Sequence, residues 1–600
     1  MTVSAKQTSG AASAAAPDTQ VLDVSRLCVS VRAQGVLKPL VSDVSFQLRK
    51  GQTLALAGES GSGKSLTSLA IMGLLPPPAV QVTGGAIRLG DQDLTQINEA
   101  TMRDIRGNRI AMIFQEPMTS LNPVLTIGTQ LVEAIRAHDP VSRNEARSRA
   151  LEALRAVRIN QPEQRMMQYP HELSGGMRQR VMIAMALALE PEILIADEPT
   201  TALDVTVQRE VLDLLRDLQA EHGTAILLIT HDMGVVAEMA DQVIVMKDGS
   251  VVEENDTKSL FAAPTHPYTQ ALLSAVPRMG DGVKPAKDAA TDSVLRLDNL
   301  EVRFDIHGGL LGRVTHRVHA VEGVSLEINR GETFALVGES GCGKSTIARA
   351  IVGLAPYTGR IELKGQYLEG ADAQERMSRC RNVQMVFQDP MAALDPRMRV
   401  GDLIAEPLVI HGIGTPAERA TQIADLLHRV GLPAEAAQRY PHEFSGGQRQ
   451  RICIARALSL KPDLIIADES VSALDVSVQA QVLDLLQSLK RELGIAYLFI
   501  SHDMAVVENV ADRVGVMYLG QIVEMGTGAQ VFGNPQHPYT QRLIQAVPVP
   551  DPLHVRMSDV RLTGEVPSPV YPVGKSPRRV KLVNHGEGHL VSRSKPEVVE

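Results

Sequence analysis

Short apolar runs that end abruptly at polar or glycine residues recur along the chain. The stretch "LALAGESGSGKSLTSLAIMGLL" begins with an apolar run, passes through a glycine-rich turn and continues into a second apolar segment. This order predicts a buried strand, a tight turn and a helix. Further along, "EILIADEPT" and "AILLITH" predict buried strands that end at Asp-Glu and at His. The pattern therefore puts polar side chains at the ends of buried strands.

The whole arrangement is present twice. The glycine-rich segment at 58–65 returns at 338–345, and "YPHELSGG" at 169–176 returns as "YPHEFSGG" at 440–447. Between the copies, 278–293 is polar, contains Gly and Pro and has no periodicity, which indicates a linker. We predict a flexible tail at 1–20, a first domain at 21–277, the linker at 278–293, a second domain at 294–548 and a C-terminal extension at 549–600.

Composition narrows the functional classes. The 600 residues are 44% hydrophobic and 22% charged, with a net charge of -9 and a pI of about 6.0, so no overall basic field favours nucleic acid as a partner. No apolar run is long enough to cross a bilayer, and the N-terminal tail lacks the apolar core of a signal peptide. The four cysteines match neither a zinc pattern nor a disulfide framework, which favours a reducing cytosol.

Both glycine-rich segments fit the phosphate-binding pattern G-x-x-x-x-G-K-[ST] between a strand and a helix. The glycines let backbone amides approach phosphate oxygens, the lysine reaches the β- and γ-phosphates, and the last serine can hold Mg²⁺. The predicted nucleotide-binding residues are Gly58, Glu59, Ser60, Gly61, Ser62, Gly63, Lys64 and Ser65 in the first half and Gly338, Glu339, Ser340, Gly341, Cys342, Gly343, Lys344 and Ser345 in the second.

The predicted strands that end in Asp-Glu suit the chemistry of ATP hydrolysis. A buried strand that stops at two adjacent carboxylates needs a cation or a proton to compensate them. Asp197 and Asp468 suit a Mg²⁺ shell, and the glutamates that follow them, Glu198 and Glu469, suit a base that polarises the attacking water. The histidines at the ends of the later strands, His231 and His502, suit contact with the γ-phosphate.

With these motifs in order, each half resembles the nucleotide-binding domain of an ABC transporter. The resemblance implies an α/β fold of two tandem P-loop NTPase domains, each with a RecA-like core, an antiparallel β subdomain and a helical signature subdomain. It implies ATP and Mg²⁺ as ligands and head-to-tail closure, in which each signature turn covers the ATP on the opposite P-loop. The family roles fall on Gln115 and Gln388 as Q-loop residues of catalysis and of the Mg²⁺ shell with Ser65 and Ser345, on Ser174, Gly175, Gly176, Ser445, Gly446 and Gly447 as signature residues, and on Asp204 and Asp475 as D-loop residues.

A finer resemblance concerns the segments "SLNPVLTIGTQLVEAI", "THPYTQALLSAVP" and "QHPYTQRLIQAVP". They are similar to the dipeptide, oligopeptide and nickel importers, in the subset that fuses both ATPases into one chain, as in glutathione importers. This resemblance implies two integral-membrane permease subunits as partners, an indirect link to an extracytoplasmic solute-binding protein, no nucleic acid, and a peripheral location on the cytoplasmic face of the inner membrane. We also expect Thr269 and Thr540 to cap the helices that follow HPYTQ.

The sequence departs from this branch at two places. Members often carry an iron-sulfur centre on cysteines after a "GEVPSP" segment, and no cysteine follows that segment here, so we predict no cluster. The aromatic that stacks on adenine has a candidate in Phe304 of the second half, whereas the matching position of the first half is Val31. The last 30 residues hold six Lys or Arg and three Glu, which could favour an anionic membrane surface, although we expect a solvated tail.

The sequence predicts the ATP-hydrolysing subunit of an importer for a peptide-like solute. One alternative keeps the transport machinery and changes the cargo to nickel or another small solute. A second alternative is a soluble tandem ATPase factor that acts on the ribosome or DNA, for which a long charged helical linker or zinc-ligand cysteines would be expected. The chain has a short linker and no C-x-x-C motif, which favours the transporter.

Overall fold

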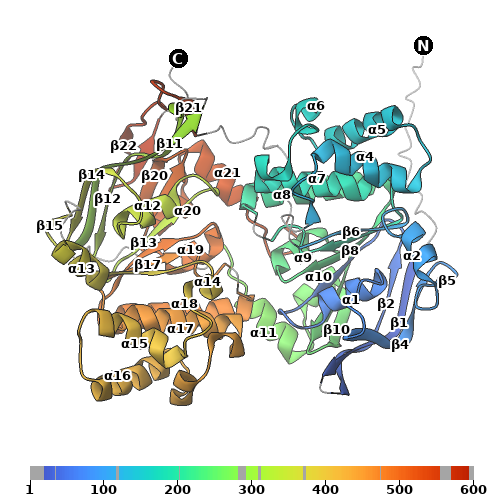
Figure 1. The fold of residues 1–600 in the computed structure, drawn as a ribbon, viewed down its shortest axis with the longest axis horizontal. Helices are drawn as coiled ribbons and strands as arrows, with labels where there is room; N and C mark the ends of the chain where they lie inside the picture. Colours follow the sequence, from blue (N-terminus) through green and yellow to red (C-terminus); the bar gives the residue numbers. More distant parts are fainter. Residues whose placement is uncertain are drawn as a thin grey trace, which may run out of the picture. The chain divides into compact units, whose positions relative to one another are not determined.

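The computed structural model describes most of the chain. The described ranges are 19–33, 35–115, 120–201, 203–280, 292–308, 312–368, 373–472, 474–554 and 569–593. The predicted tail up to residue 18, most of the linker and the "GEVPSP" segment up to residue 568 lie outside them. The chain divides into two compact units, Met1–Thr201 with Asp213–Thr230 and Met239–Leu260, and Ala202–Leu212 with His231–Glu238 and Phe261–Glu600 (Figure 1).

The first unit is built on a six-stranded sheet with the order β10-β9-β3-β8-β7-β6. Its strands are β3 (Thr53–Ala57), β6 (Ile110–Ile113), β7 (Ile193–Asp197), β8 (Ala225–Thr230), β9 (Gln242–Lys247) and β10 (Ser250–Asp256). All neighbours are parallel except the pair β9 and β10. The three central strands β3, β7 and β8 are buried over their whole length, which explains their unbroken apolar runs.

A second, antiparallel sheet of the first unit has the order β2-β1-β4-β5. Its strands are β1 (Gln20–Ala33), β2 (Val36–Arg49), β4 (Val80–Leu89) and β5 (Gln92–Asp93). The helices of this half are α1 (Lys64–Ile71), α2 (Glu99–Ile105), α4 (Ile127–His138), α5 (Arg143–Ala156), α6 (Pro162–Arg165), η1 (Pro170–Glu172) and α7 (Gly175–Leu187), followed by α8 (Val205–His222), α9 (Met233–Met239) and α10 (Thr257–Ala262), which include residues assigned to both units.

The second unit repeats this plan with larger sheets, in the orders β16-β17-β18-β13-β19-β20-β23-β22 and β15-β14-β11-β12-β21. Its strands are β11 (Ser293–Gly308), β12 (Arg313–Asn329), β13 (Thr333–Val337), β14 (Thr358–Leu363), β15 (Gln366–Tyr367), β16 (Val383–Val386), β17 (Leu464–Asp468), β18 (Ala496–Ile500), β19 (Arg513–Tyr518), β20 (Gln521–Thr527), β21 (Val570–Pro572), β22 (Leu582–Asn584) and β23 (Leu590–Ser592). The predicted class of two tandem α/β domains is confirmed.

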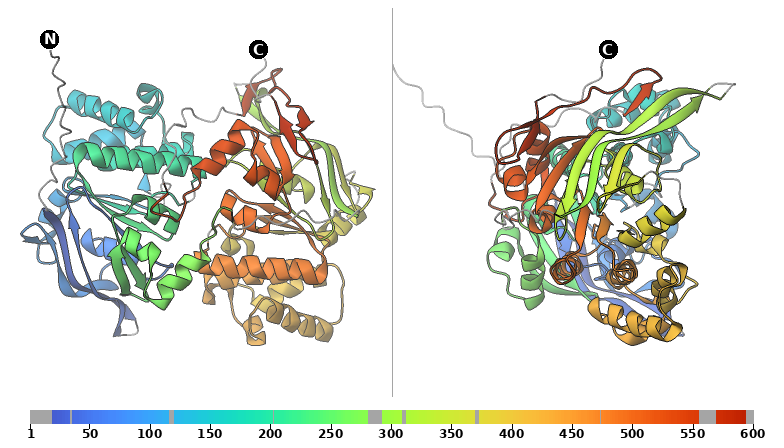
Figure 2. Two further views of the ribbon diagram at one scale, coloured as in Figure 1. Left: turned by 180° about the vertical axis from the view of Figure 1, so that it is seen from behind. Right: turned by 90° about the vertical axis from the view of Figure 1, so that its left-hand side faces the viewer.

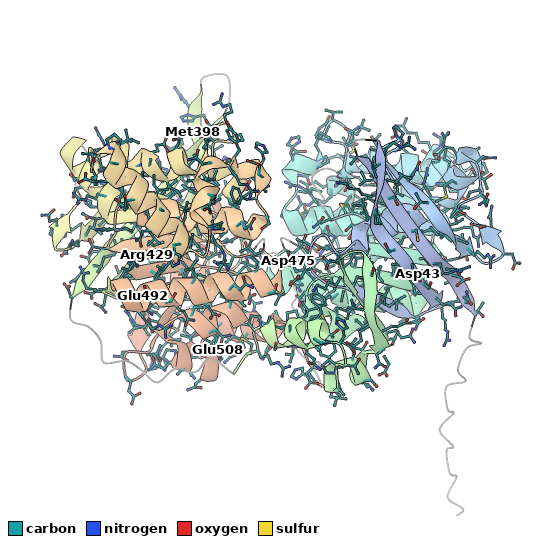
Figure 3. All side chains as sticks on the ribbon, turned by 90° about the horizontal axis from the view of Figure 1, so that it is seen from below. Asp43, Met398, Arg429, Asp475, Glu492 and Glu508 are labelled. Carbon is teal, nitrogen blue, oxygen red and sulfur yellow. The ribbon has the colours of Figure 1, made fainter. Side chains whose placement is uncertain are left out.

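Helices of the second unit cover its sheets and form a helical subdomain. They are α11 (Pro267–Ala275), α12 (Lys344–Ile351), α13 (Ala373–Asn382), α14 (Pro390–Ala393), α15 (Val400–Ile410), α16 (Pro416–Arg429), η2 (Ala434–Gln438), η3 (Pro441–Glu443), α17 (Gly446–Leu458), α18 (Val476–Leu493), α19 (Met504–Val510), α20 (Gly528–Gly533) and α21 (Pro538–Ala546). Arg429 of α16 lies 2.8 Å from Asp425 and 3.7 Å from Glu492 of α18, which links two of these helices (Figure 3). Among the described residues, none of the helices combines the length and apolarity that a bilayer span requires.

The C-terminal extension is folded where the structure describes it. β21 adds a strand to the five-stranded sheet beside β12, and β23 with β22 extends the eight-stranded sheet beyond β20. Both views in Figure 2 show this dark red segment against the yellow-green strands of the same unit. The expectation of a solvated tail is only partly right for 571–593: this segment forms strands in which Tyr571 and Val591 are buried, whereas its Lys and Arg side chains are exposed. The remaining residues lie outside the described ranges.

The expected caps of the two HPYTQ helices are also wrong. Helices α11 and α21 begin at the proline, and the preceding histidines, His266 and His537, are the N-cap residues. Their Nδ1 atoms accept hydrogen bonds from the second amide of each helix, at 3.1 and 3.2 Å. Proline fixes the first helical position, since it needs no amide partner there, and this moves the cap three residues upstream of Thr269 and Thr540.

Candidate active site

Each P-loop wraps around the ammonium group of its own lysine. In the first half, Lys64 Nζ donates to the carbonyl oxygens of Gly58 and Glu59 at 2.8 and 2.7 Å. In the second half, Lys344 Nζ donates to Gly338 and Glu339 at 2.6 and 2.9 Å. Both lysines are at least 95% buried, with exposed fractions of 5% and 4%. The backbone carbonyl groups of each loop therefore surround a buried positive charge.

Glycine is required at the first P-loop position for a steric reason. Gly58 and Gly338 both have φ of 144°. A Cβ atom at these positions would lie 2.3 Å from the carbonyl oxygen of Met246 and 2.2 Å from that of Met517. The loop can lie this close to the neighbouring strand only without a side chain.

The serine that follows each P-loop lysine contacts the aspartate that ends the buried strand β7 or β17. Ser65 Oγ donates to Asp197 Oδ1 at 3.0 Å, and Ser345 Oγ donates to Asp468 Oδ1 at 2.8 Å. Burial raises the pKa of Asp197 to about 6, against the lowering effect of the Ser65 hydrogen bond, and it also raises the pKa of Asp468. A buried carboxylate beside a hydroxyl supplies the oxygen ligands that a hard cation prefers.

The next residue in each half is the glutamate predicted as the base. Glu198 and Glu469 have φ of 48° and 47°, in the left-handed region that residues with a side chain rarely adopt. Gln115 Nε2 donates to Glu198 Oε2 at 2.7 Å, and Gln388 makes the same 2.7 Å bond to Glu469. The structure thus brings together each Q-loop glutamine and its glutamate.

The predicted γ-phosphate histidine of the second half, His502, lies beside Glu469. Its Nδ1 is 3.6 Å from Glu469 Oε1. The hydrogen bond with His502 lowers the pKa of Glu469. Burial acts to lower the pKa of His502, but the hydrogen bond to Glu469 and the nearby carboxylate charges together raise it. His231, its counterpart, follows β8 directly and is half-buried.

The signature residues form two helix starts, at which Ser174, Gly175, Ser445 and Gly446 are exposed and Gly447 is buried. Ser174 and Ser445 are the N-cap residues of α7 and α17, and each Oγ accepts a hydrogen bond from the amide three residues on, at 3.3 and 3.4 Å. Gly175, Gly446 and their neighbours Gly176 and Gly447 form the first turns. Among the described residues of the second half, no contact joins the turn at Ser445 to Lys344 of the same half. A helix start with accessible amides favours an anion.

The two D-loop aspartates occupy different environments within the second unit, to which 203–212 also belongs. Asp204 Oδ1 accepts a hydrogen bond of 2.6 Å from the amide of Ser340 in the P-loop, and Thr206 Oγ1 donates to Glu339 Oε1 at 2.5 Å. Asp475 is the N-cap residue of α18. A residue of the first D-loop therefore contacts the second P-loop.

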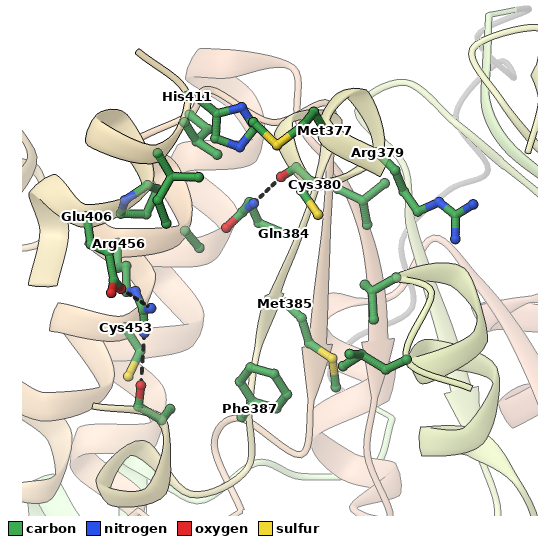
Figure 4. A pocket seen from close by; sticks show the side chains of 18 residues that line it. Met377, Arg379, Cys380, Gln384, Met385, Phe387, Glu406, His411, Cys453 and Arg456 are labelled. Carbon is green, nitrogen blue, oxygen red and sulfur yellow. Dashed lines mark hydrogen bonds and ion pairs between the residues drawn. The ribbon is translucent and has the colours of Figure 1, made fainter. Parts of the chain in front are cut away.

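A cavity that the sequence did not reveal lies beside the second Q-loop. Its volume is about 380 Å³, and its lining includes Phe387, which precedes Gln388, and Ile410 at the end of α15. Figure 4 shows its mixed walls, with the 2.7 Å ion pair between Arg456 and Glu406 on one side. Its lining comes from α13, β16, α15 and α17, so local sequence patterns gave no signal for it.

Comparisons with known proteins identify the family of the chain. The family model described as "ABC transporter" matches 41–201 and 321–472, and the model described as "Oligopeptide/dipeptide transporter, C-terminal region" matches 252–299 and 523–574. The chain is 50% identical to the glutathione import ATP-binding proteins GsiA of Pectobacterium atrosepticum and of Escherichia coli strain K12, with 96% of this chain and 97% of each relative covered.

A solved structure of the ATP-binding cassette MJ0796 bound to ADP and phosphate is 29% identical, with a TM-score of 0.36, and the match covers 39% of this chain and 98% of the other. Two P-loops with their Asp-Glu strands, the two family matches and the full-length relatives lead to one assignment. The chain belongs to the ABC transporter family and is an ATPase with two tandem ATP-binding cassette domains.

Proposed function

We propose that this ATPase powers the import of glutathione or a related short peptide through a membrane permease. The observation that carries the proposal is the duplicated set of P-loop, Gln, Asp-Glu and His residues in a chain whose halves both end in the oligopeptide/dipeptide transporter region. The name of its relatives, glutathione import ATP-binding protein, supports the substrate class. An ATPase subunit does not itself select cargo, so nickel or another small solute remains the alternative within the same machinery.

The residues of each site support hydrolysis by positioning and electrostatics. Lys64 and Lys344 would hold the β- and γ-phosphates, and the glutamates that accept from Gln115 and Gln388 would orient the attacking water for in-line attack. Ser65 with Asp197, and Ser345 with Asp468, would hold Mg²⁺ together with the Q-loop glutamines. Bound Mg²⁺ would neutralise the charge that develops on the phosphate oxygens. The buried, cation-compatible pairing of hydroxyl and carboxylate fits this role.

We further propose two permease subunits as direct partners and an extracytoplasmic solute-binding protein as an indirect one, on the cytoplasmic face of the inner membrane. The cavity beside Phe387 and Gln388 would receive one permease, because it combines an apolar wall with an ion pair next to a catalytic residue. Movement of the permease could then change the position of Gln388, which donates to Glu469.

Purification of the full chain from membranes in mild detergent tests this proposal. We expect two hydrophobic permease chains to co-purify, and glutathione import by reconstituted vesicles to require ATP. Ile410→Glu in the cavity should reduce co-purification while ATP binding is kept. The matched control is Val409→Glu, since Val409 is 55% exposed and does not line the cavity.

Other outcomes would point elsewhere. Recovery with ribosomes or DNA and without permeases would support the tandem ATPase factor and overturn the transporter. Import of nickel and not of glutathione would keep the machinery and replace the cargo. Equal loss of permease from both variants would reject the cavity as the docking site.

A further inference from the structure

The second half has an apolar surface beside its P-loop that has no counterpart among the described residues of the first half. In the register of β11 and β12, Phe304 lies directly opposite Val318, and Val318 lies directly opposite Val570 of β21. Directly opposed residues of antiparallel strands point to the same face, so the three side chains form one row across three strands. Phe304 and Val570 are 41% and 37% exposed. We call Phe304, Val318 and Val570 the apolar row.

The apolar row lies next to the P-loop. The carbonyl oxygen of Ala320, two residues along β12 from Val318, would lie 2.1 Å from a Cβ atom at Gly343. Two residues of a strand span roughly 7 Å. A base attached to a triphosphate in the P-loop would therefore meet this row.

The opposite face of the same strands is closed by a buried polar network. Arg303 donates to both carboxylate oxygens of Glu322 at 2.6 and 2.9 Å, and His319 Nδ1 lies 2.5 Å from Glu322 Oε1. Burial alone would raise the pKa of Glu322, but hydrogen bonds from Arg303 and His319 hold it below its ordinary value. Since His319 and Glu322 are each 3% exposed, a base can approach only the face of the apolar row.

The C-terminal extension holds β21 in place through this network. The ring of Tyr571 packs edge-on against His319 with centroids 5.3 Å apart. Arg579 contacts Glu301 of β11 and donates to Asn299 Oδ1 at 3.2 Å. The amide of His319 donates to the carbonyl oxygen of Pro569 at 2.9 Å.

The first half offers an internal comparison. Its equivalent strands place Val31 opposite Lys38, and within the described residues β2 is the edge of its sheet, so no third strand adjoins it. The positions that match Arg303 and Glu322 are Ser30 and Ser42. Among the described residues, the Arg303–Glu322 pair and the added strand β21 therefore occur together in the second half and have no counterpart in the first.

We propose that β21 is part of the second nucleotide site: Val570 completes the surface that receives the adenine ring, and Arg579 and Tyr571 position that strand. This inference rests on the proposed ATP sites. The second site consequently binds the base more tightly than the first.

ATP binding to full-length variants with one site disabled tests the proposal. Lys64→Ala isolates the second site and Lys344→Ala isolates the first. Val570→Asp should weaken ATP binding at the second site by roughly three- to tenfold, given the apolar contact of one valine. It should leave the binding of inorganic triphosphate, which has no base, and the first site unchanged.

Matched controls separate base contact from folding of the extension. Val573→Asp alters the same segment outside the apolar row and should leave ATP affinity unchanged. Arg579→Ala should weaken the binding of ATP and leave the binding of triphosphate unchanged. Arg578→Ala should leave the binding of both unchanged, since it keeps the backbone carbonyl that accepts a hydrogen bond from Gln521.

Three results would overturn the inference. Val570→Asp and Val573→Asp could weaken ATP binding equally, Val570→Asp could weaken the binding of ATP and of triphosphate equally, or Val570→Asp could weaken ATP binding equally at the two sites. If instead Lys64→Ala and Lys344→Ala leave the ATP stoichiometry unchanged, the proposed sites themselves are wrong, which distinguishes the two failures.

Discussion

At the scale of single residues, Glu198 and Glu469 are held in a conformation that costs energy. Their positive φ turns the backbone sharply at the end of a buried strand, where the Q-loop glutamine meets the carboxylate at 2.7 Å in both halves. Strain of about 1–3 kcal/mol persists only where the surroundings over-determine it. The position of both carboxylates could be predicted from the Asp-Glu pattern, but their strain depends on tertiary contacts and could not.

Removal of the two carboxylate charges should stop turnover and keep nucleotide binding. In Glu198→Gln with Glu469→Gln, the Q-loop contact and the shape survive, while the base is lost, so we expect hydrolysis to fall by roughly a hundredfold or more. Equilibrium dialysis with ATP and a phosphate-release assay measure the two quantities. Glu190→Gln is the control, because Glu190 also has a positive φ, of 51°, but precedes its strand. Rapid hydrolysis by the double variant would mean that the carboxylates are misassigned.

At the scale of elements, the sequence predicted helices and strands well where the signal is local. Buried parallel strands β7 and β17 carry unbroken apolar runs, and both P-loops follow their pattern. Strands β21, β22 and β23 were missed because each has only three residues, and their pairing partners lie far away in the sequence. The predicted N-cap residues of the HPYTQ helices are wrong because proline at the first helical position decides where each helix begins.

Helix α16 provides a local test of how a cap stabilises the signature subdomain. Thr415 and Glu418 form a reciprocal capping box, with bonds of 3.3 and 2.7 Å between side chains and amides. Thr415→Ala should destabilise the first turn by about 1 kcal/mol. Hydrogen exchange of the first-turn amides should accelerate by roughly fivefold, in line with that free energy. Thr421→Ala in the same helix is the control, and equal acceleration in both variants would rule out a specific cap effect.

At the scale of the whole molecule, the resemblance predicts that each ATP site takes residues from both halves. Two observations motivate this arrangement. Among the described second-half residues, the signature turn at Ser445 makes no contact with Lys344. The D-loop residue Asp204 accepts a hydrogen bond from the second P-loop. The paired roles were predicted from the resemblance, whereas the difference between the two adenine surfaces depends on a third strand that local pattern could not reveal.

Double variants should reveal which residues share a site. In the Glu198→Gln/Glu469→Gln background, Lys64→Ala with Ser445→Arg should damage one site twice and leave about one trapped ATP per chain. Lys64→Ala with Ser174→Arg should damage both sites and leave almost none, because residues that share a site are coupled. Trapped nucleotide after rapid gel filtration is the readout. Equal trapping by the two variants would show that each half closes on itself or on another chain.

The strands contributed by the C-terminal extension also constrain how the protein is made. β12 is translated long before β21, and until Val570 to Pro572 emerge its outer edge has no partner, with Val318 at the opposed position. The first domain avoids this interval, since the edge strand β2 carries Lys38 and Pro39, which discourage pairing with other chains. Until its final strands arrive, the nascent second domain therefore displays an unpaired sheet edge at His316, Arg317 and Val318, and unpaired strand edges are prone to aggregation.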